Sequence, residues 1–187
     1  MAEIILYHGT SEKLARQIEA EGFIPDKKYN WPVKSKKGFI YLSSVYSPFY
    51  AMKHGVKLAI IKVSVDTKDL YPEDDFIMTA LGHPKYSQAQ LDAVKLKNYK
   101  KFWKESLKYL GNVAAKPKKI RILGVRYFDG KKLIWKCDPV ISPINFKIMG
   151  DYYKELTEWI YEGKPIEEFR NSFEVPPIQA NPSGVVI

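Results

Sequence analysis

The strongest constraint on the fold is the opening stretch "EIILYHGTSEKLARQIEAEGFIP". Its first five residues, Glu3–Tyr7, are apolar and β-prone, which predicts a strand. Ser11 then suits a helix N-cap, and the apolar residues after it recur at helical spacing. Gly22 stands where a C-cap glycine belongs, with a proline just beyond. A strand must therefore turn into a short helix at His8-Gly9-Thr10.

The remaining pattern predicts an α+β fold in which strands and helices are mixed along the chain. Further strands are expected at 38–44, 57–65, 112–116, 120–128 and 132–140, and helices at 47–55, 86–110 and 151–173. Ser47 is the expected cap of the second helix, and Asp129-Gly130 is a predicted hairpin turn between the last two strands. Loops are expected at 26–38 and 66–76. We expect one domain over 1–149, followed by a helix and a Pro-rich tail over 150–187.

Composition narrows the class of protein. The chain is 45% hydrophobic over 187 residues, which is enough for one domain with a core. The chain has no run of eighteen apolar residues, so no membrane-spanning helix is predicted. Its N-terminus lacks the basic region of a signal peptide, so a cytoplasmic location is expected. The one cysteine, Cys137, and three scattered histidines predict neither a disulfide framework nor a structural metal site.

The positive charge is concentrated in one segment. The net charge is +9, and Val94–Arg121 holds nine Lys and one Arg against a single acid, Glu105. Such a segment suits a nucleic-acid partner, with lysines on phosphates and Tyr99 or Trp103 stacked on bases. The alternatives are a solvated helix face for the lysines and a core position for Phe102 and Trp103. The candidate nucleic-acid contacts are Lys97, Lys100, Lys101, Lys104 and Lys108.

Three short motifs carry candidate chemistry. His8, at the end of a strand and beside Gly9, can hydrogen-bond a ribose hydroxyl or a phosphate, because glycine lets a ligand approach the backbone. Tyr41, in the second strand, can stack on a flat heterocycle. The carboxylates of Glu73–Asp75 can orient ribose hydroxyls, stabilise a developing cation or bind a divalent ion. Each motif also has a plain alternative: a structural histidine, a half-buried strand tyrosine and a solvated loop.

Taken together, "YHGT", "IYLSS" and the later "EDD" resemble the ADP-ribosyltransferase fold of the His–Tyr–acid class. The spacing is similar to that of rifampin ADP-ribosyltransferases, to DNA-targeting ADP-ribosyltransferase toxins and, more distantly, to RNA 2′-phosphotransferases. The resemblance covers roughly Glu3–Tyr127. It implies a split β-sheet core with peripheral helices, and an enzyme that transfers ADP-ribose from NAD and releases nicotinamide.

The resemblance also implies roles for individual residues. His8 would bond the ribose next to nicotinamide, and Tyr41 would stack against nicotinamide. Gly9 would let NAD approach the strand, and Thr10 would help to hold the adenosine side. Asp75 would orient the ribose and stabilise the oxocarbenium-like transition state as nicotinamide leaves. Ser43 and Ser44, which follow Tyr41, complete the expected cofactor-binding set.

Two departures from the family keep other functions open. Many members carry the catalytic Glu at the start of a later strand, where this chain has Asn112, which cannot stabilise a cation by charge. Either Asp75 supplies the acid, or Asn112 replaces it in a non-catalytic module that binds a nucleotide or nucleic acid. RNA 2′-phosphotransferases use several cleft arginines, whereas this chain has only Arg16, Arg121, Arg126 and Arg170, so that activity ranks lower. The acceptor of a transferase would be a nucleic acid, a protein or a small molecule.

Overall fold

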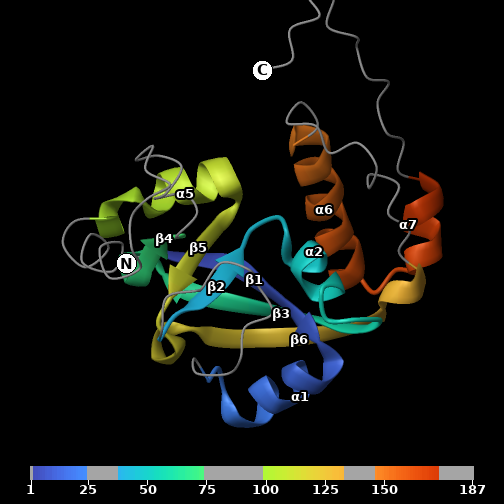
Figure 1. The fold of residues 1–187 in the computed structure, drawn as a ribbon, viewed down its shortest axis with the longest axis horizontal. Coiled ribbons are helices and arrows are strands. Elements are labelled where there is room, and N and C mark those ends of the chain that lie inside the picture. Colours follow the sequence, from blue (N-terminus) through green and yellow to red (C-terminus); the bar gives the residue numbers. More distant parts are fainter. Residues whose placement is uncertain (1, 25–37, 74–98, 133–145, 173–187) are drawn as a thin grey trace, which may run out of the picture.

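A computed structural model describes residues 2–24, 38–73, 99–132 and 146–172. It is a mixed α/β structure built on one six-stranded antiparallel sheet, which agrees with the predicted α+β class (Figure 1). The sheet has the order β4-β5-β2-β1-β3-β6. Its strands are β1 (Glu3–Ser11), β2 (Ile40–Ser43), β3 (Lys57–Asp66), β4 (Leu70–Pro72), β5 (Asn112–Ala115) and β6 (Arg121–Asp129).

The sheet consists of two three-stranded halves that are joined at one point. β1 pairs with β3 along its whole length, from Glu3↔Asp66 to Ser11↔Leu58, and β3 continues the pairing to β6. In the other half, β5 lies between β2 and β4. Between the halves, within the described residues, the ladder of β1 and β2 has the one pair Tyr7↔Ser43. This bridge lies at the last residue of β2.

The helices that the structure describes agree with the predicted starts and stops at α1 and at the end of α5. They are α1 (Glu12–Glu21), α2 (Ser47–Met52), α5 (Trp103–Leu110), α6 (Phe146–Tyr161) and α7 (Ile166–Ser172). The Ser11 hydroxyl accepts a hydrogen bond from the Leu14 amide, which confirms the predicted N-cap of α1. Gly22 and Gly111 end α1 and α5 with φ values of 78° and 66°, a region that glycine enters without strain.

Two buried clusters pack against the sheet, because successive strand residues face opposite sides. On β1, Leu6 belongs to the first cluster and Tyr7 to the second; on β3, Ile61 and Ile60 divide in the same way. The first cluster receives Ala15 and Phe23 from α1 and its C-terminal side, together with side chains of α5. The second cluster is formed with α2, α6 and α7, which lie together on the right in Figure 1.

Helix α6 is anchored to the first half-sheet by one tyrosine. The Tyr161 hydroxyl lies 3.0 Å from the carbonyl oxygen of Ile60 and 3.1 Å from that of Gly124. It is placed beside the irregularity between Lys62 and Val63, where the register of β3 and β6 shifts. Burial raises the pKa of Tyr161 well above its ordinary value, so the hydroxyl keeps its proton. Helix α6 thus shares a hydrophobic core with the sheet.

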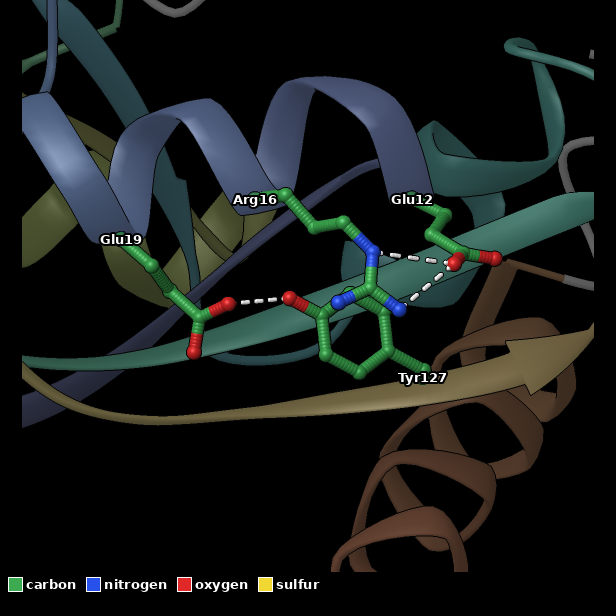
Figure 2. A network of polar contacts seen from close by, with 4 residues as sticks. All are labelled: Glu12, Arg16, Glu19 and Tyr127. Atoms are coloured by element: carbon green, nitrogen blue, oxygen red, sulfur yellow. Dashed lines mark hydrogen bonds and ion pairs between the residues drawn. The ribbon is translucent and has the colours of Figure 1, made fainter.

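A polar network on the surface ties α1 to β6 (Figure 2). Arg16 donates two hydrogen bonds to the Glu12 carboxylate, and its guanidinium lies 4.6 Å from the centroid of the Tyr127 ring. The Tyr127 hydroxyl donates to Glu19. Burial and the Glu19 carboxylate together raise the pKa of Tyr127 to about 12.

Three sequence predictions about strands, loops and caps were wrong. The first strand does not break at His8-Gly9-Thr10: β1 continues to Ser11, because these residues pair with β3. The predicted acidic loop at 66–76 contains the short strand β4 after a 3₁₀ turn at Thr67–Asp69, because Leu70 is fully buried and pairs with Ala115. Ser47 does not cap α2: Tyr46 is the N-cap residue, without a side-chain bond to the helix. Ser47 is instead buried, with its hydroxyl 3.5 Å from that of Thr157.

The single helix predicted at 151–173 is two helices, α6 and α7. The break follows from Gly163, which has a φ of 73°, and from Pro165, which cannot continue α6. For the helix predicted at 86–110, the described part is a 3₁₀ turn at Tyr99–Phe102 followed by α5. The predicted second strand of the hairpin, at 132–140, lies almost entirely outside the described residues, as do the loop at 26–38 and the tail.

No helix among the described residues is long and apolar enough to cross a membrane.

Candidate functional site

The bridge between the half-sheets brings predicted site residues from three strands close together. Tyr7 of β1 pairs with Ser43 of β2, and Ser43 pairs with Asn112 of β5. These three residues form a row across the sheet. His8 follows Tyr7 directly, and Tyr41 stands two residues before Ser43. The position predicted for the catalytic acid, the first residue of β5, is therefore next to β2, which carries Tyr41, and one strand away from β1, which carries His8.

The His8 side chain is fixed by the backbone of the neighbouring half-sheet. Its Nδ1 lies 3.0 Å from the Tyr41 carbonyl oxygen, and its ring makes an edge contact with Phe23, with 5.3 Å between the ring centroids. A carbonyl oxygen can only accept, so Nδ1 carries the proton. In the neutral imidazole Nε2 is then an acceptor, which suits it to bind a hydroxyl group.

His8 is held in this neutral form. Burial lowers its pKa and outweighs the opposite effect of the bond to Tyr41, and the nearby His54 lowers it further. Burial also lowers the pKa of His54. Both side chains are therefore neutral in the folded chain at a pH at which the unfolded chain begins to take up protons.

We expect the protein to lose stability as the pH falls below about 6.5, the ordinary pKa of histidine. The sign follows from proton uptake: between that value and the lower folded pKa, the unfolded chain binds more protons, so acid favours unfolding. Hydrogen bonds from Ser64 and Lys68 lower the pKa values of Glu3 and Asp66. These two carboxylates therefore reduce the stability of the folded chain only below their ordinary pKa values of 4.5 and 3.8.

The measurement is the urea midpoint between pH 7 and pH 5. The variant His8→Gln can still donate to the Tyr41 carbonyl but does not titrate, so its stability should depend less on pH in this range. An equal dependence in the wild type and the variant would contradict the assignment to His8.

The Tyr41 side chain does not share a face with His8. Ile40 and Leu42 belong to the same cluster as Leu6, so alternation along β2 places Tyr41 on the other face, together with Ser43. Tyr41 is half-buried and pairs with Ala114. His8 thus meets the backbone of Tyr41, while the Tyr41 side chain lies on the face of Asn112.

The two serines after Tyr41 have clear structural partners. The hydroxyls of Ser43 and Ser44 donate to the Gly111 carbonyl at 3.0 and 3.2 Å. The Ser43 hydroxyl also accepts from the amides of Val45 and Tyr46 at 3.1 and 2.7 Å. These bonds fix the turn before α2 against the turn before β5. A role of either serine in binding a cofactor stays a prediction.

Gly9 has a packing reason of its own. A β-carbon at this position would lie 1.7 Å from the Ser47 carbonyl oxygen and 2.8 Å from the Ala51 amide nitrogen. The backbone of α2 thus fills the side to which a residue at position 9 would project. The next residue, Thr10, is buried with 2% of its surface exposed. The roles of Gly9 and Thr10 toward NAD stay predictions.

Asn112 is the centre of a buried polar network. Its Nδ2 donates to the Tyr50 hydroxyl at 2.6 Å and to the Glu73 carboxylate at 3.1 Å. The Ser106 hydroxyl donates to the Asn112 carbonyl at 2.7 Å and accepts from the Glu73 amide at 2.9 Å. Asn112 is 5% exposed, and its Oδ1 is the one buried side-chain polar atom of the described residues without a hydrogen-bond partner.

Two members of this network, Tyr50 and Ser106, are not among the predicted site residues. Tyr50 was expected only as part of a short helix, and Ser106 only as part of a longer one. Glu73 belongs to the candidate acidic cluster Glu73–Asp75, from which the resemblance favours Asp75 as the acid. Asn112 is reached from the sequence only through the resemblance, as the residue that stands where many members of the family carry the catalytic Glu.

The remaining predicted site residues are exposed or not described. Asp75 and Lys97 lie outside the described residues. Lys100, Lys101, Lys104 and Lys108 are all exposed on the 3₁₀ turn and α5. The ammonium groups of Lys101 and Lys104 lie 5.1 and 5.7 Å from the ring centroids of their neighbours Phe102 and Trp103. Trp103 packs against the first core cluster, which confirms its predicted core position.

Among the described residues, no group of three or more His, Cys, Asp or Glu side chains could hold a metal ion. No protein-family model matches the chain, and neither does any curated protein or solved structure.

Proposed function

We propose that this protein binds NAD where its two half-sheets meet and transfers ADP-ribose from it, with release of nicotinamide. One observation carries the proposal. At the strand position where the resembled family has its acid, the Asn112 amide is held by a carboxylate and its Oδ1 is buried without a partner. The half-sheets, joined at Tyr7↔Ser43, support a split core of the ADP-ribosyltransferase type.

The side chains near the bridge suit two parts of NAD, the ribose and the nicotinamide ring. The unprotonated Nε2 of His8 would accept a hydrogen bond from a ribose hydroxyl. Tyr41, on the face of Asn112, would stack against the nicotinamide ring. These two residues lie on opposite faces of the sheet, so NAD would have to pass the end of the β1–β2 ladder, beyond the bridge, to reach both.

The proposed reaction changes two bonds at the anomeric carbon of the ribose. The bond from this carbon to the pyridinium nitrogen breaks, and its electron pair stays with nicotinamide, which leaves neutral. The ribose becomes oxocarbenium-like, and a nearby carboxylate stabilises that charge. A nucleophile of the acceptor then donates an electron pair to the same carbon and loses its proton to water. Nucleic acids, proteins and small molecules all offer such nucleophiles.

A second candidate is a non-catalytic module that binds a nucleotide or nucleic acid. It is favoured by the exposed lysines of the 3₁₀ turn and α5, and by the lack of charge on Asn112 itself. Such a module would bind nucleic acid with an affinity that falls steeply as the salt concentration rises, and it would not consume NAD. Replacing Lys100, Lys101, Lys104 and Lys108 together by Ala would then remove most of that affinity.

The test is calorimetric titration of the protein with NAD, followed by measurement of free nicotinamide in the same sample. We expect binding by the wild type, a loss of affinity of at least about tenfold in His8→Ala and Tyr41→Ala, and no change in Lys154→Ala, an exposed residue of α6. Each variant is first shown to be folded by its urea midpoint. Absence of binding by the folded wild type would refute the NAD site, and binding without nicotinamide release would favour the module.

A further inference from the structure

Glu73 is held to Asn112 through both its backbone and its side chain. The buried Ser106 hydroxyl connects the Glu73 amide to the Asn112 carbonyl, and the Asn112 Nδ2 donates to the Glu73 carboxylate. Glu73 directly follows β4, whose last residue, Pro72, pairs with Val113 of β5. The half-buried carboxylate thus stands in a fixed place beside the first residue of β5.

The orientation of the Asn112 amide follows from this contact. An ionised carboxylate only accepts hydrogen bonds, so the amide must turn its NH₂ group toward Glu73 and its oxygen away. The oxygen is thereby left buried without a donor. A buried acceptor without a donor is unfavourable, and a ligand that supplies an O–H or N–H group would satisfy it. The amide oxygen and the carboxylate together form a pair of acceptors, one neutral and one charged, that suits the two hydroxyls of a ribose.

We propose that Glu73 is the catalytic carboxylate of this protein, and that Asn112 is the residue that positions it. The Asn112 Oδ1 accepts one ribose hydroxyl, while Glu73 supplies the negative charge for the cation that develops when nicotinamide leaves. This inference rests on the proposed function. It answers the question left by the sequence, because the charge missing from Asn112 is present on the side chain that Asn112 holds, and Asp75 is not required.

The test compares Glu73→Gln with Asp75→Asn in the full chain, with NAD as the substrate. Glutamine keeps an oxygen that can accept from Asn112, so the variant should stay folded and bind NAD within about threefold of the wild type. We expect its rate of nicotinamide release to fall by about 10²-fold or more, a loss of the size seen when one group that stabilises transition-state charge is removed. Glu155→Gln, which removes the charge of an exposed carboxylate on α6, is the matched control and should release nicotinamide at the wild-type rate, whereas Asp75→Asn tests the other candidate acid.

The outcomes separate this inference from the proposed function. A wild type that releases nicotinamide while Glu73→Gln is unimpaired, or while Asp75→Asn is equally impaired, would overturn the role of Glu73 and leave the function standing. A wild type that releases none would overturn the transfer reaction and the charge role. The ribose site would then be decided by binding of ADP-ribose, whose affinity Asn112→Ala should lower at least about tenfold. An unchanged affinity, or no binding of either nucleotide, would overturn that part as well.

Discussion

Gly9→Ala should destabilise the fold by at least about 3 kcal/mol, the largest effect that we expect from any single methyl group in this chain. The added carbon would lie 1.7 Å from the Ser47 carbonyl oxygen and close to the Ala51 amide. Both are backbone atoms of α2, so no side chain can rotate out of the way. Either α2 moves off β1 or the strand bends, and each response disturbs the second core cluster, to which α2 contributes Phe49 and Met52.

The measurement is the free energy of unfolding in urea, and Gly124→Ala is the control. Gly124 is also a strand glycine, but a β-carbon there would meet no heavy atom within 4 Å. We expect this variant to stay within about 1 kcal/mol of the wild type, because replacing glycine at an open position mainly restricts the unfolded chain. Equal effects of the two substitutions would show that strand conformation, and not the approach of α2, determines the requirement for glycine at position 9.

The elements that could be predicted from sequence are those fixed by neighbouring residues. The strand that begins at Glu3, the Ser11 cap and the Gly22 stop depend on neighbouring residues, and the structure has all three, although the strand continues through His8-Gly9-Thr10, where a break is predicted, to Ser11. The residues that break the helix between α6 and α7, Gly163 and Pro165, are equally local. One continuous helix is nevertheless predicted, because the amphipathic pattern continues across Gly163-Lys164-Pro165. β4 was missed because three residues carry too little periodicity. β4 is a strand because it pairs with β5, a segment that lies far from it in the sequence.

The candidate site could be predicted only in part, because its contacts join distant segments. His8 is predicted as a polar residue beside a strand-end glycine and Asn112 only through the resemblance, and the structure places both beside the bridge of the half-sheets. The partners of Asn112, Tyr50 and Glu73, are 62 and 39 residues away in the chain, so no local pattern connects them. Gly9 illustrates the opposite case: the residue was noticed, but glycine next to a histidine does not reveal whether a ligand or a helix comes close.

Asn112→Asp is the second substitution with a large expected effect, because it places two carboxylates in contact. The introduced carboxylate could not donate to Glu73 or to the Tyr50 hydroxyl as the amide does. At pH 7 we expect the free energy of unfolding to fall by about 2 kcal/mol or more, because the charge-assisted bond is broken and the like charges repel each other. Below about pH 5 the loss should shrink. A proton shared by the two carboxylates is bound more tightly in the folded chain than in the unfolded one, so acid favours this variant relative to the wild type.

The exchange variant, Asn112→Asp combined with Glu73→Gln, separates this electrostatic cause from a simple misfit. It restores one amide and one carboxylate, because the glutamine introduced on the β4 side can donate to the aspartate introduced on β5. We expect it to regain most of the stability at pH 7 and to lose the unusual pH dependence, so that the two substitutions couple in a double-mutant cycle by about 1–3 kcal/mol. Additive losses would mean that Asn112 is needed for its own shape and not for its bond to Glu73.

The same exchange variant also tests what transfer requires of the carboxylate. It keeps the negative charge but moves it from the residue after β4 to the first residue of β5, where the two side chains are in hydrogen-bond contact. In the nicotinamide assay it should therefore recover activity that Glu73→Gln alone has lost, because the charge still lies beside the developing cation. Stability regained without activity would mean that the place of the carboxylate, and not only its charge, is required for transfer.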